Sequence, residues 1–305
     1  MMNSVEELSS RSLYTLNKEL LALRNQKTER KISISKIKHF YSYLLQGNFK
    51  RIFQKTNDMI GNHRGSVDDY PLRDYSRFPD VKVAVYTCVW GRYDEIHEPL
   101  YLSPNLDYYI ITDQDIKPSS AWKKKELPES IINKLTSPIE VNRFCKMLPH
   151  RIFQDYDYSI YIDGNIIVVA DLMPLISDME GKPLAVHSYP LTDCIYEMGK
   201  SIAAGKKAKK VDINAQLRRY KQEGFPQHYG AFECNILIRD HHSANCNSLM
   251  ESWWDEFCNT PTKRDQLSFA FVLWKRNYNL TEIHSLGPNV RFNPRFQIQN
   301  HVQQK

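Results

Sequence analysis

The sequence predicts an α/β fold in which a mostly parallel central sheet is flanked by helices. Apolar stretches at residues 81–89, 106–112 and 158–169 are rich in Val, Ile and Tyr, as buried strands are. Helical patterns separate the strands, notably over residues 140–153 and 264–274. The first two strands each end in a polar loop, which is how an open α/β sheet begins a ligand site.

Further elements continue this alternation along the chain. A short strand is expected at residues 122–127, a loop with a new helix start at 171–174, a strand at 183–187 and another at 232–239. Residues 193–225 are basic and helical, which fits a lid, an acceptor-binding insertion or a solvated helical face. A packed helix is expected at residues 249–257.

The amino-acid composition, with 42% hydrophobic and 25% charged residues, is that of a soluble globular protein. The 305 residues suffice for one large α/β domain with an appendage, or for two smaller domains. The net charge of +6 is unevenly distributed, because the first 55 residues and residues 200–221 carry much of the excess. This distribution indicates an anionic partner, for which a nucleotide, a phospholipid and a nucleic acid all qualify.

The expected location is the cytoplasm. The six cysteines show neither a C-x-x-C pair nor zinc-like spacing with histidines, as is typical of reduced core residues. The N-terminus lacks the apolar segment of a secretory signal, and no run reaches the length of a membrane span.

The first 80 residues are predicted to form a helical appendage and linker, followed by the main domain over residues 81–305. Leucines recur at helical spacing over residues 5–24, and a basic amphipathic pattern covers residues 33–54. Residues 61–80 resemble a linker. These helices suit packing on the domain itself, self-association into a homo-oligomer, or peripheral membrane contact through residues 1–55 on anionic lipid.

The centre of the predicted site is Asp163-Gly-Asn165, which interrupts an apolar strand. The side chains of Asp163 and Asn165 offer oxygens to one hard cation, although such a sequence also forms ordinary turns. Arg143 and Lys146 share a helix face and are placed to reach a diphosphate, unless they are simply solvated. His284 is a candidate third metal ligand.

Four motifs in this order resemble one family of glycosyltransferases with the GT-A fold, long labelled domain of unknown function 616. They are Val85-Tyr-Thr-Cys-Val-Trp-Gly91-Arg-Tyr-Asp94, Arg143-Phe-Cys-Lys146-Met-Leu-Pro-His150, Tyr158-Ser-Ile-Tyr-Ile-Asp163-Gly-Asn165 and Arg264-Asp-Gln-Leu-Ser-Phe269. The resemblance covers residues 81–294. That family occurs in bacterial polysaccharide clusters and plant cell-wall pathways, and the resemblance implies a single Rossmann-like GT-A domain.

The resemblance also implies transfer of a sugar from a nucleotide sugar, UDP-linked by expectation, to a surface-polysaccharide, glycan or lipid-linked acceptor. Mn²⁺ or Mg²⁺ at Asp163-Gly-Asn165 would neutralise the departing diphosphate, with help from Arg143 and Lys146. The nucleoside side would contact Tyr86, Thr87, Arg92 and Asp113. Residues that would face the sugar and acceptor are Glu233, Asn235, Asp265 and Gln266.

Asn165 stands where the more usual Asp-x-Asp motif has its second Asp, so a metal-independent mechanism stays open. An inverting reaction would use Asp265 or Glu233 as the base, whereas in a retaining reaction they would position the donor. Asp265 also suits a helix cap, and Asp113 suits a turn. The alternative function is a non-catalytic basic protein that binds an anionic membrane or, less favoured, nucleic acid.

Overall fold

The computed structural model describes residues 13–22, 80–91 and 94–299. A seven-stranded sheet forms the centre of the domain, with strand order β3-β2-β1-β4-β7-β6-β8. Its strands are β1 (Val83–Val89), β2 (Leu106–Thr112), β3 (Lys123–Lys124), β4 (Tyr158–Ile162), β6 (Leu184–Ser188), β7 (Phe232–Asp240) and β8 (Ile283–Ser285).

Only β7 runs against its neighbours in this sheet. It pairs antiparallel with both β4 and β6, whereas the pairs β1–β2, β2–β3, β1–β4 and β6–β8 are parallel. The prediction of an α/β fold with a mostly parallel central sheet is therefore confirmed. The carboxyl ends of β1, β4 and β6 lie at the same edge as the start of β7, so this edge collects their loops.

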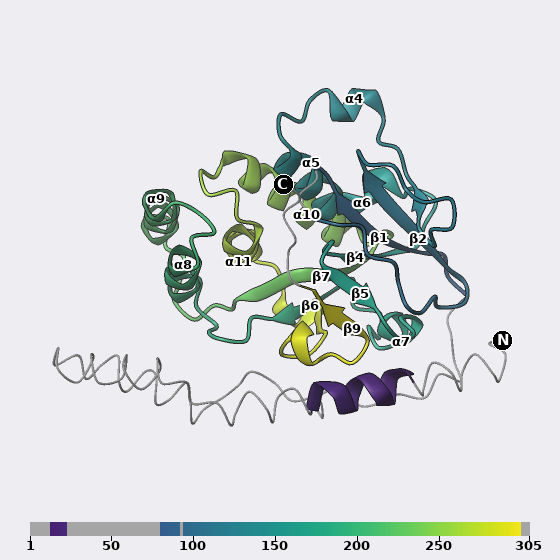
Figure 1. Cartoon of the computed structure of the whole chain (residues 1–305). Helices are drawn as coiled ribbons and strands as arrows, with labels where there is room; N and C mark the ends of the chain where they lie inside the picture. The colour runs from purple at the N-terminus through teal and green to yellow at the C-terminus, as the bar shows by residue number, and fades with distance from the viewer. Residues whose placement is uncertain (1–12, 23–79, 92–93, 300–305) are drawn as a thin grey trace, which may run out of the picture.

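Helices cover both faces of the sheet (Figure 1). They are α4 (Glu129–Ile132), α5 (Pro138–Met147), α6 (Pro149–Ile152), α7 (Met173–Ser177), α8 (Ile195–Ala204), α9 (Lys210–Gln222), α10 (Ala244–Asn259) and α11 (Asp265–Lys275). Short 3-10 turns occur at η2 (Leu280–Glu282) and η3 (Val290–Phe292). The helical pattern over residues 140–153 divides into α5 and α6, because Pro149 lacks the N–H that would continue the first helix.

Strand β1 shows why the sheet is covered on both faces. All seven of its residues are buried. Ala84, Tyr86 and Cys88 belong to one apolar core, which includes side chains of α5, α10 and α11, and Val83 and Val85 belong to the other. Alternate residues of a strand point to opposite faces, so each face of β1 contributes to its own core.

A second, two-stranded sheet lies beside the main one. It pairs β5 (Ile166–Val168) antiparallel with β9 (Phe296–Ile298). The apolar stretch at residues 158–169 thus forms two strands, β4 and β5, separated by Asp163-Gly-Asn165.

A helix over residues 13–22 packs against the end of the domain near β9 (Figure 1). Tyr14, Asn17 and Leu21 are buried in this contact, while Leu16 and Leu20 are exposed. The predicted helix over residues 33–54 and most of the predicted linker at 61–80 lie outside the described residues.

Candidate active site

Two basic and two acidic side chains meet where β4 ends. Lys146 Nζ lies 2.6 Å from Asp265 Oδ2 and 3.2 Å from Asp163 Oδ1. Arg143 Nε lies 3.4 Å from Asp265 Oδ2. Lys146 and Asp265 are almost fully buried, whereas 32% of the Asp163 side chain is exposed. Asp163 therefore presents a carboxylate to solvent, and Lys146 lies beneath it.

Local sequence places each of these residues. Asp163 follows β4, and its backbone N–H donates to the carbonyl of Asn235 at 2.9 Å, which continues the pairing with β7. Helix α5 begins at a Ser137 cap followed by Pro138, and Arg143 and Lys146 lie one turn apart on it. Asp265 is the first residue of α11 and no side chain caps that helix, so the carboxylate is available to Lys146.

The electrostatics favour an ionised Asp265. Burial alone would raise the pKa of this carboxyl, but the charges of Arg143, Lys146 and Arg264 outweigh burial and hold the pKa well below its usual range. For Arg143, burial opposes its charge, while Asp265 and Asp163 raise its pKa. Asp265 and Arg143 thus remain charged across the physiological pH range.

A buried arginine that the sequence-based prediction missed supports Lys146 from below. Arg239 donates to the Lys146 carbonyl at 2.6 Å and to the Tyr86 hydroxyl at 2.8 Å, and that hydroxyl donates to the Cys145 carbonyl at 2.8 Å. A cation at the C-terminus of a helix is stabilised by the helix dipole. The one signal in the sequence is an arginine at the end of the apolar strand Ile236-Leu-Ile-Arg239.

Tyr86 therefore lies beneath the site instead of at its surface. Its side chain is fully buried, and its hydroxyl contacts protein groups. Thr87 is buried as well, and its hydroxyl has no hydrogen-bond partner within the described part of the chain. Asp113 accepts from the Gly91 N–H with both carboxylate oxygens at 3.1 Å, so it fixes the loop after β1. Arg92 lies outside the described residues.

Glu233 and Asn235 come from the start of β7. Glu233 Oε2 accepts from the Val290 N–H at 3.2 Å. Burial raises the pKa of Glu233. Asn235 is opposite the end of β4, and its Oδ1 is buried with no hydrogen-bond partner in the described ranges. Gln266 follows Asp265 and is half-buried. The structure thus gathers Arg143, Lys146, Asp163, Asn235 and Asp265, with Glu233 two residues before Asn235.

His284 is not brought to Asp163. It lies on β8, three strands from β4 in the order β4-β7-β6-β8, which corresponds to about 14 Å at the usual strand spacing. Asn165 is turned toward the chain end, because its Nδ2 donates to the Gln299 carbonyl at 3.0 Å.

The carboxylates of the site decide whether it suits a divalent metal. The described residues contain no group of three or more His, Cys, Asp or Glu side chains that could hold a metal ion. Asp163, with its exposed carboxylate, fits a cation such as Mg²⁺, which is bound through one or two carboxylates while substrate phosphates and water supply the remaining ligands. The residues thus fit a metal that arrives with a diphosphate.

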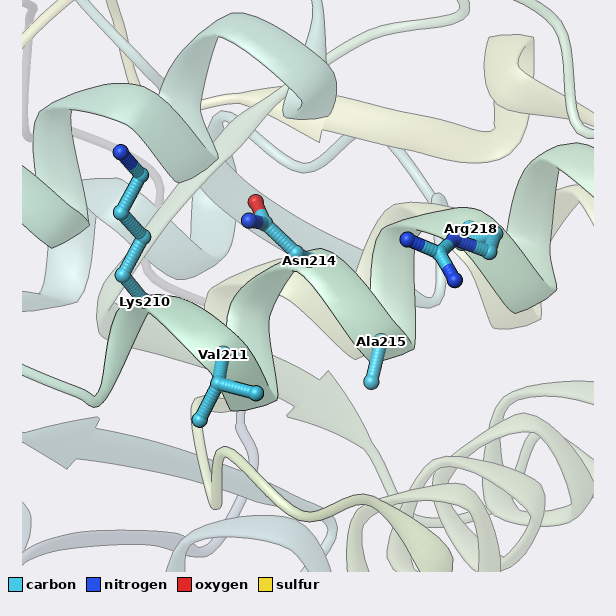
Figure 2. A pocket seen from close by; sticks show the side chains of 5 residues that line it. All are labelled: Lys210, Val211, Asn214, Ala215 and Arg218. Atoms are coloured by element: carbon cyan, nitrogen blue, oxygen red, sulfur yellow. The ribbon is translucent and has the colours of Figure 1, made fainter.

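A shallow hollow lies elsewhere, on the outer face of α9. Figure 2 shows its lining residues, Lys210, Val211, Asn214, Ala215 and Arg218. All five belong to α9. The hollow is therefore separate from the Asp163 cluster. No helix within the described ranges has the length and apolar character needed to cross a membrane.

Comparison with known proteins places the chain in a family. The model of the family described as TOD1/MUCI70, glycosyltransferase-like domain, matches residues 132–293, which is more than half of the chain. The chain belongs to this family. The match includes Arg143, Lys146, Asp163, Glu233 and Asp265, so the charged cluster lies wholly within the glycosyltransferase-like domain. The prediction of a glycosyltransferase-like domain is thereby confirmed.

One relative is the probable hexosyltransferase MUCI70 of Arabidopsis thaliana. It is 28% identical over 139 residues, which is 42% of this chain and 23% of the relative. The matched segment thus spans about a quarter of that protein.

Among solved structures, the apo form of the bifunctional glycosyltransferase WbbM matches 71% of this chain and 40% of its own, with 11% identity and a TM-score of 0.42. The apo form of mouse xyloside xylosyltransferase 1 matches 73% of this chain and 96% of its own, with 10% identity and a TM-score of 0.35.

Proposed function

We propose that this protein transfers a sugar from a UDP-linked donor to a glycan or lipid-linked acceptor, and that Asp163 is the centre of the donor site. One observation carries the proposal: buried Lys146 is shared between Asp163 and Asp265, next to Arg143. With Arg264 nearby, this group contains three cations and two carboxylates. The excess of positive charge suits the diphosphate that leaves during sugar transfer.

A divalent cation, Mn²⁺ or Mg²⁺, fits this proposal at Asp163, with Asn165 as the neighbouring residue from the sequence motif. When bound, it would neutralise negative charge that develops on the leaving diphosphate. Arg143 and Lys146 contribute fixed positive charge that would neutralise the same diphosphate. Because this protein charge is already in place, part of the donor binding should persist without metal.

Glu233 suits the role of the base better than Asp265 does. Asp265 is buried and held ionised by three cations, and such a carboxylate has little tendency to take a proton. The raised pKa of Glu233 makes it a stronger base. In this proposal Glu233 accepts the proton of the acceptor hydroxyl in an inverting reaction, and Asp265 with Gln266 orients the donor sugar. In a retaining reaction Glu233 would have only a positioning role.

The experiment is the thermal stability of the protein with UDP, with and without Mn²⁺. UDP should raise the midpoint, and more so with Mn²⁺, because a ligand that prefers the folded state stabilises it. Asp163→Ala should remove the Mn²⁺-dependent part. Asp155→Ala is the matched control, since Asp155 is an exposed aspartate outside the cluster. No stabilisation of the parent protein by UDP would refute the donor assignment, and a retained Mn²⁺ effect in Asp163→Ala would refute the site.

A second candidate function is peripheral binding to an anionic membrane through the surface of α8 and α9, and one observation favours it. None of seven exposed cations has an ion-pair partner among the described residues; they are Lys200, Lys206, Lys207, Lys209, Lys210, Arg218 and Lys221. The same surface exposes the apolar side chain of Val211 to 69%. Basic residues with exposed apolar groups are typical of helices that rest on anionic lipid.

Sedimentation with vesicles containing phosphatidylserine tests this second function. Replacing Lys206, Lys207 and Lys209 by Glu should abolish binding, because each basic residue near such a surface contributes about 1 kcal/mol. The control replaces Lys123, Lys124 and Lys125 by Glu, which changes the net charge equally at another part of the surface. Equal loss of binding in both variants, or no binding by the parent, would count against the surface of α8 and α9.

A further inference from the structure

The helix over residues 13–22 contacts the domain through a buried amide. Asn17 is only 4% exposed. Its Nδ2 donates to the Pro294 carbonyl at 2.7 Å and to the Phe296 carbonyl at 3.5 Å, and its Oδ1 accepts from Gln297 Nε2 at 3.0 Å. Both ends of the Asn17 amide are therefore occupied by the chain that forms β9.

Two neighbouring contacts fix the same segment. The ring of Tyr14, which is 2% exposed, lies 5.0 Å from the Arg295 guanidinium. Arg295 is itself buried, and its Nε donates to the Asp171 carbonyl at 3.1 Å. The Arg295 carbonyl accepts from the Val169 N–H at 2.9 Å. One face of the helix thus holds residues 294–297 against the chain that follows β5.

Strand β9 is connected to the Asp163-Gly-Asn165 turn through its partner strand. It pairs with β5, which begins immediately after Asn165. Beyond β9, the Gln299 N–H donates to the Asn165 carbonyl at 2.8 Å, and Asn165 Nδ2 donates to the Gln299 carbonyl at 3.0 Å. Contacts therefore run without interruption from Asn17 through β9 to Asn165, two residues from Asp163.

The small sheet at the centre of this connection is not stable alone. The sheet of β5 and β9 has two strands of three residues each, and isolated sheets of this size are marginal in water. A small displacement of β9 would accordingly move the turn relative to the fixed Lys146.

We propose that Asn17 is a positioning residue: through β9, the helix over residues 13–22 sets the conformation of the Asp163-Gly-Asn165 turn. The helix and β9 both lie outside residues 132–293, which match the family model. The support for the turn thus comes from segments outside the part of the chain that matches the family model. The consequence for donor binding rests on the proposed function, whereas the coupling itself does not.

The test measures amide hydrogen exchange on the full chain, comparing Asn17→Ala with Thr15→Ala. Thr15 lies on the same helix and is exposed. Both changes raise helix propensity, so loss of the helix itself does not separate them. In Asn17→Ala, the amides of Ile166, Val169 and Gln299 should exchange about tenfold faster or more, since removing a buried hydrogen-bond partner favours local opening. The amides of β1 should keep their rates.

Two outcomes would overturn the coupling: Asn17→Ala exchanging at the turn no faster than Thr15→Ala, or equal acceleration in β1, which would indicate general destabilisation. Stabilisation by UDP with Mn²⁺ provides the functional measurement, and it should be smaller in Asn17→Ala than in Thr15→Ala. If UDP fails to stabilise even the parent, the proposed donor site is refuted, while the exchange rates still decide the coupling.

Discussion

Lys146 connects the buried and the exposed parts of the site. Its ammonium group lies between Asp265, which is 3% exposed, and Asp163, which solvent reaches. A buried carboxylate is costly without a counter-charge, so removing one partner of a buried pair destabilises a protein by about 3–5 kcal/mol. The same lysine thereby supports both the fold and the charge of the site.

Replacing Lys146 by Met should lower the free energy of unfolding by about 3 kcal/mol, because Arg143 is then the one ion-pair partner left to Asp265 among the described residues. Urea denaturation at neutral pH measures the change. The control is Lys123→Met, which breaks the exposed pair with Asp107 and should cost less than about 1 kcal/mol. Equal losses in the two variants would show that the buried pair contributes no more stability than the exposed pair.

Asp265 should also make the protein sensitive to acid. Its pKa in the folded protein lies below the ordinary value of 3.8, so the stability that it contributes is complete above that pH and is lost as the pH falls below about 4. Denaturation by urea at pH 6 and pH 3 tests this expectation. The free energy of unfolding should differ less between pH 6 and pH 3 in Asp265→Asn than in the parent. In Asp155→Asn the difference should equal that of the parent.

Glu233 should govern the acid side of the activity profile. Burial raises its pKa, so the carboxylate is lost at a higher pH than for an exposed glutamate, and turnover should fall as the pH drops through that raised pKa. Glu233→Gln should lower kcat about 10²- to 10⁴-fold, the usual contribution of a general base. A Glu233→Gln variant with near-normal kcat, whose turnover falls at the same low pH as that of the parent, would exclude this role.

At the level of elements, the loop after β1 is fixed by close packing against α5. Gly91 has φ of +73°, and a Cβ at this position would lie 2.6 Å from Pro138 Cβ, at the start of α5. The Gly91 N–H also donates to Asp113. Because α5 carries Arg143 and Lys146, the position of this loop affects the charged cluster.

Gly91→Ala should therefore cost more stability than Gly181→Ala. Both glycines have positive φ, so the backbone strain is similar, but a Cβ at Gly181 meets nothing within 4 Å. The clash at Gly91 should add about 1–3 kcal/mol, as overpacking usually does. Thermal or urea unfolding of the two variants gives the comparison, and equal losses would mean that Pro138 moves aside easily.

Elements with a strong local pattern were predictable from the sequence. Residues 106–112 were expected as a strand and form β2, and residues 232–239 were expected as a strand and form β7 as far as Asp240. Strand β9 was missed, because a strand of three residues carries too little pattern to be recognised. Its contacts are with β5 and with the helix over residues 13–22, which are distant in sequence.

The candidate site was predictable in its residue types and less so in its contacts. The motif placed Asp163 at the end of a strand and Lys146 on a helix, and both positions are as expected. The ion pair between Lys146 and Asp265 joins two helices far apart in the sequence, so no local pattern reveals it. Arg239 escaped assignment for the same reason, because its contact with Lys146 arises only from tertiary packing. Tyr86 was expected to contact the nucleoside, whereas tertiary packing buries its side chain beneath the site.

For the whole molecule, the helix over residues 13–22 joins the two ends of the described chain. It was predicted as part of an appendage, and one of its faces is buried against the segment that leads into β9. The opposite face exposes Leu16 to 54% and Leu20 to 40%, which is the surface available for the predicted self-association. The two faces can therefore be tested separately in the full chain.

The double variant Tyr14→Ala, Leu21→Ala should lose at least about 4 kcal/mol of unfolding free energy, since large-to-small changes at buried positions cost about 2–5 kcal/mol each. The matched variant Leu16→Ala, Leu20→Ala should change stability little, because those side chains are already in water.

Light scattering then gives the molar mass of both variants. If the exposed leucines mediate a homo-oligomer, only the second variant will be smaller than the parent while keeping its stability. Equal stability in the two variants would instead show that the helix is not held on the domain in solution, and the coupling of Asn17 to Asp163 would fail with it.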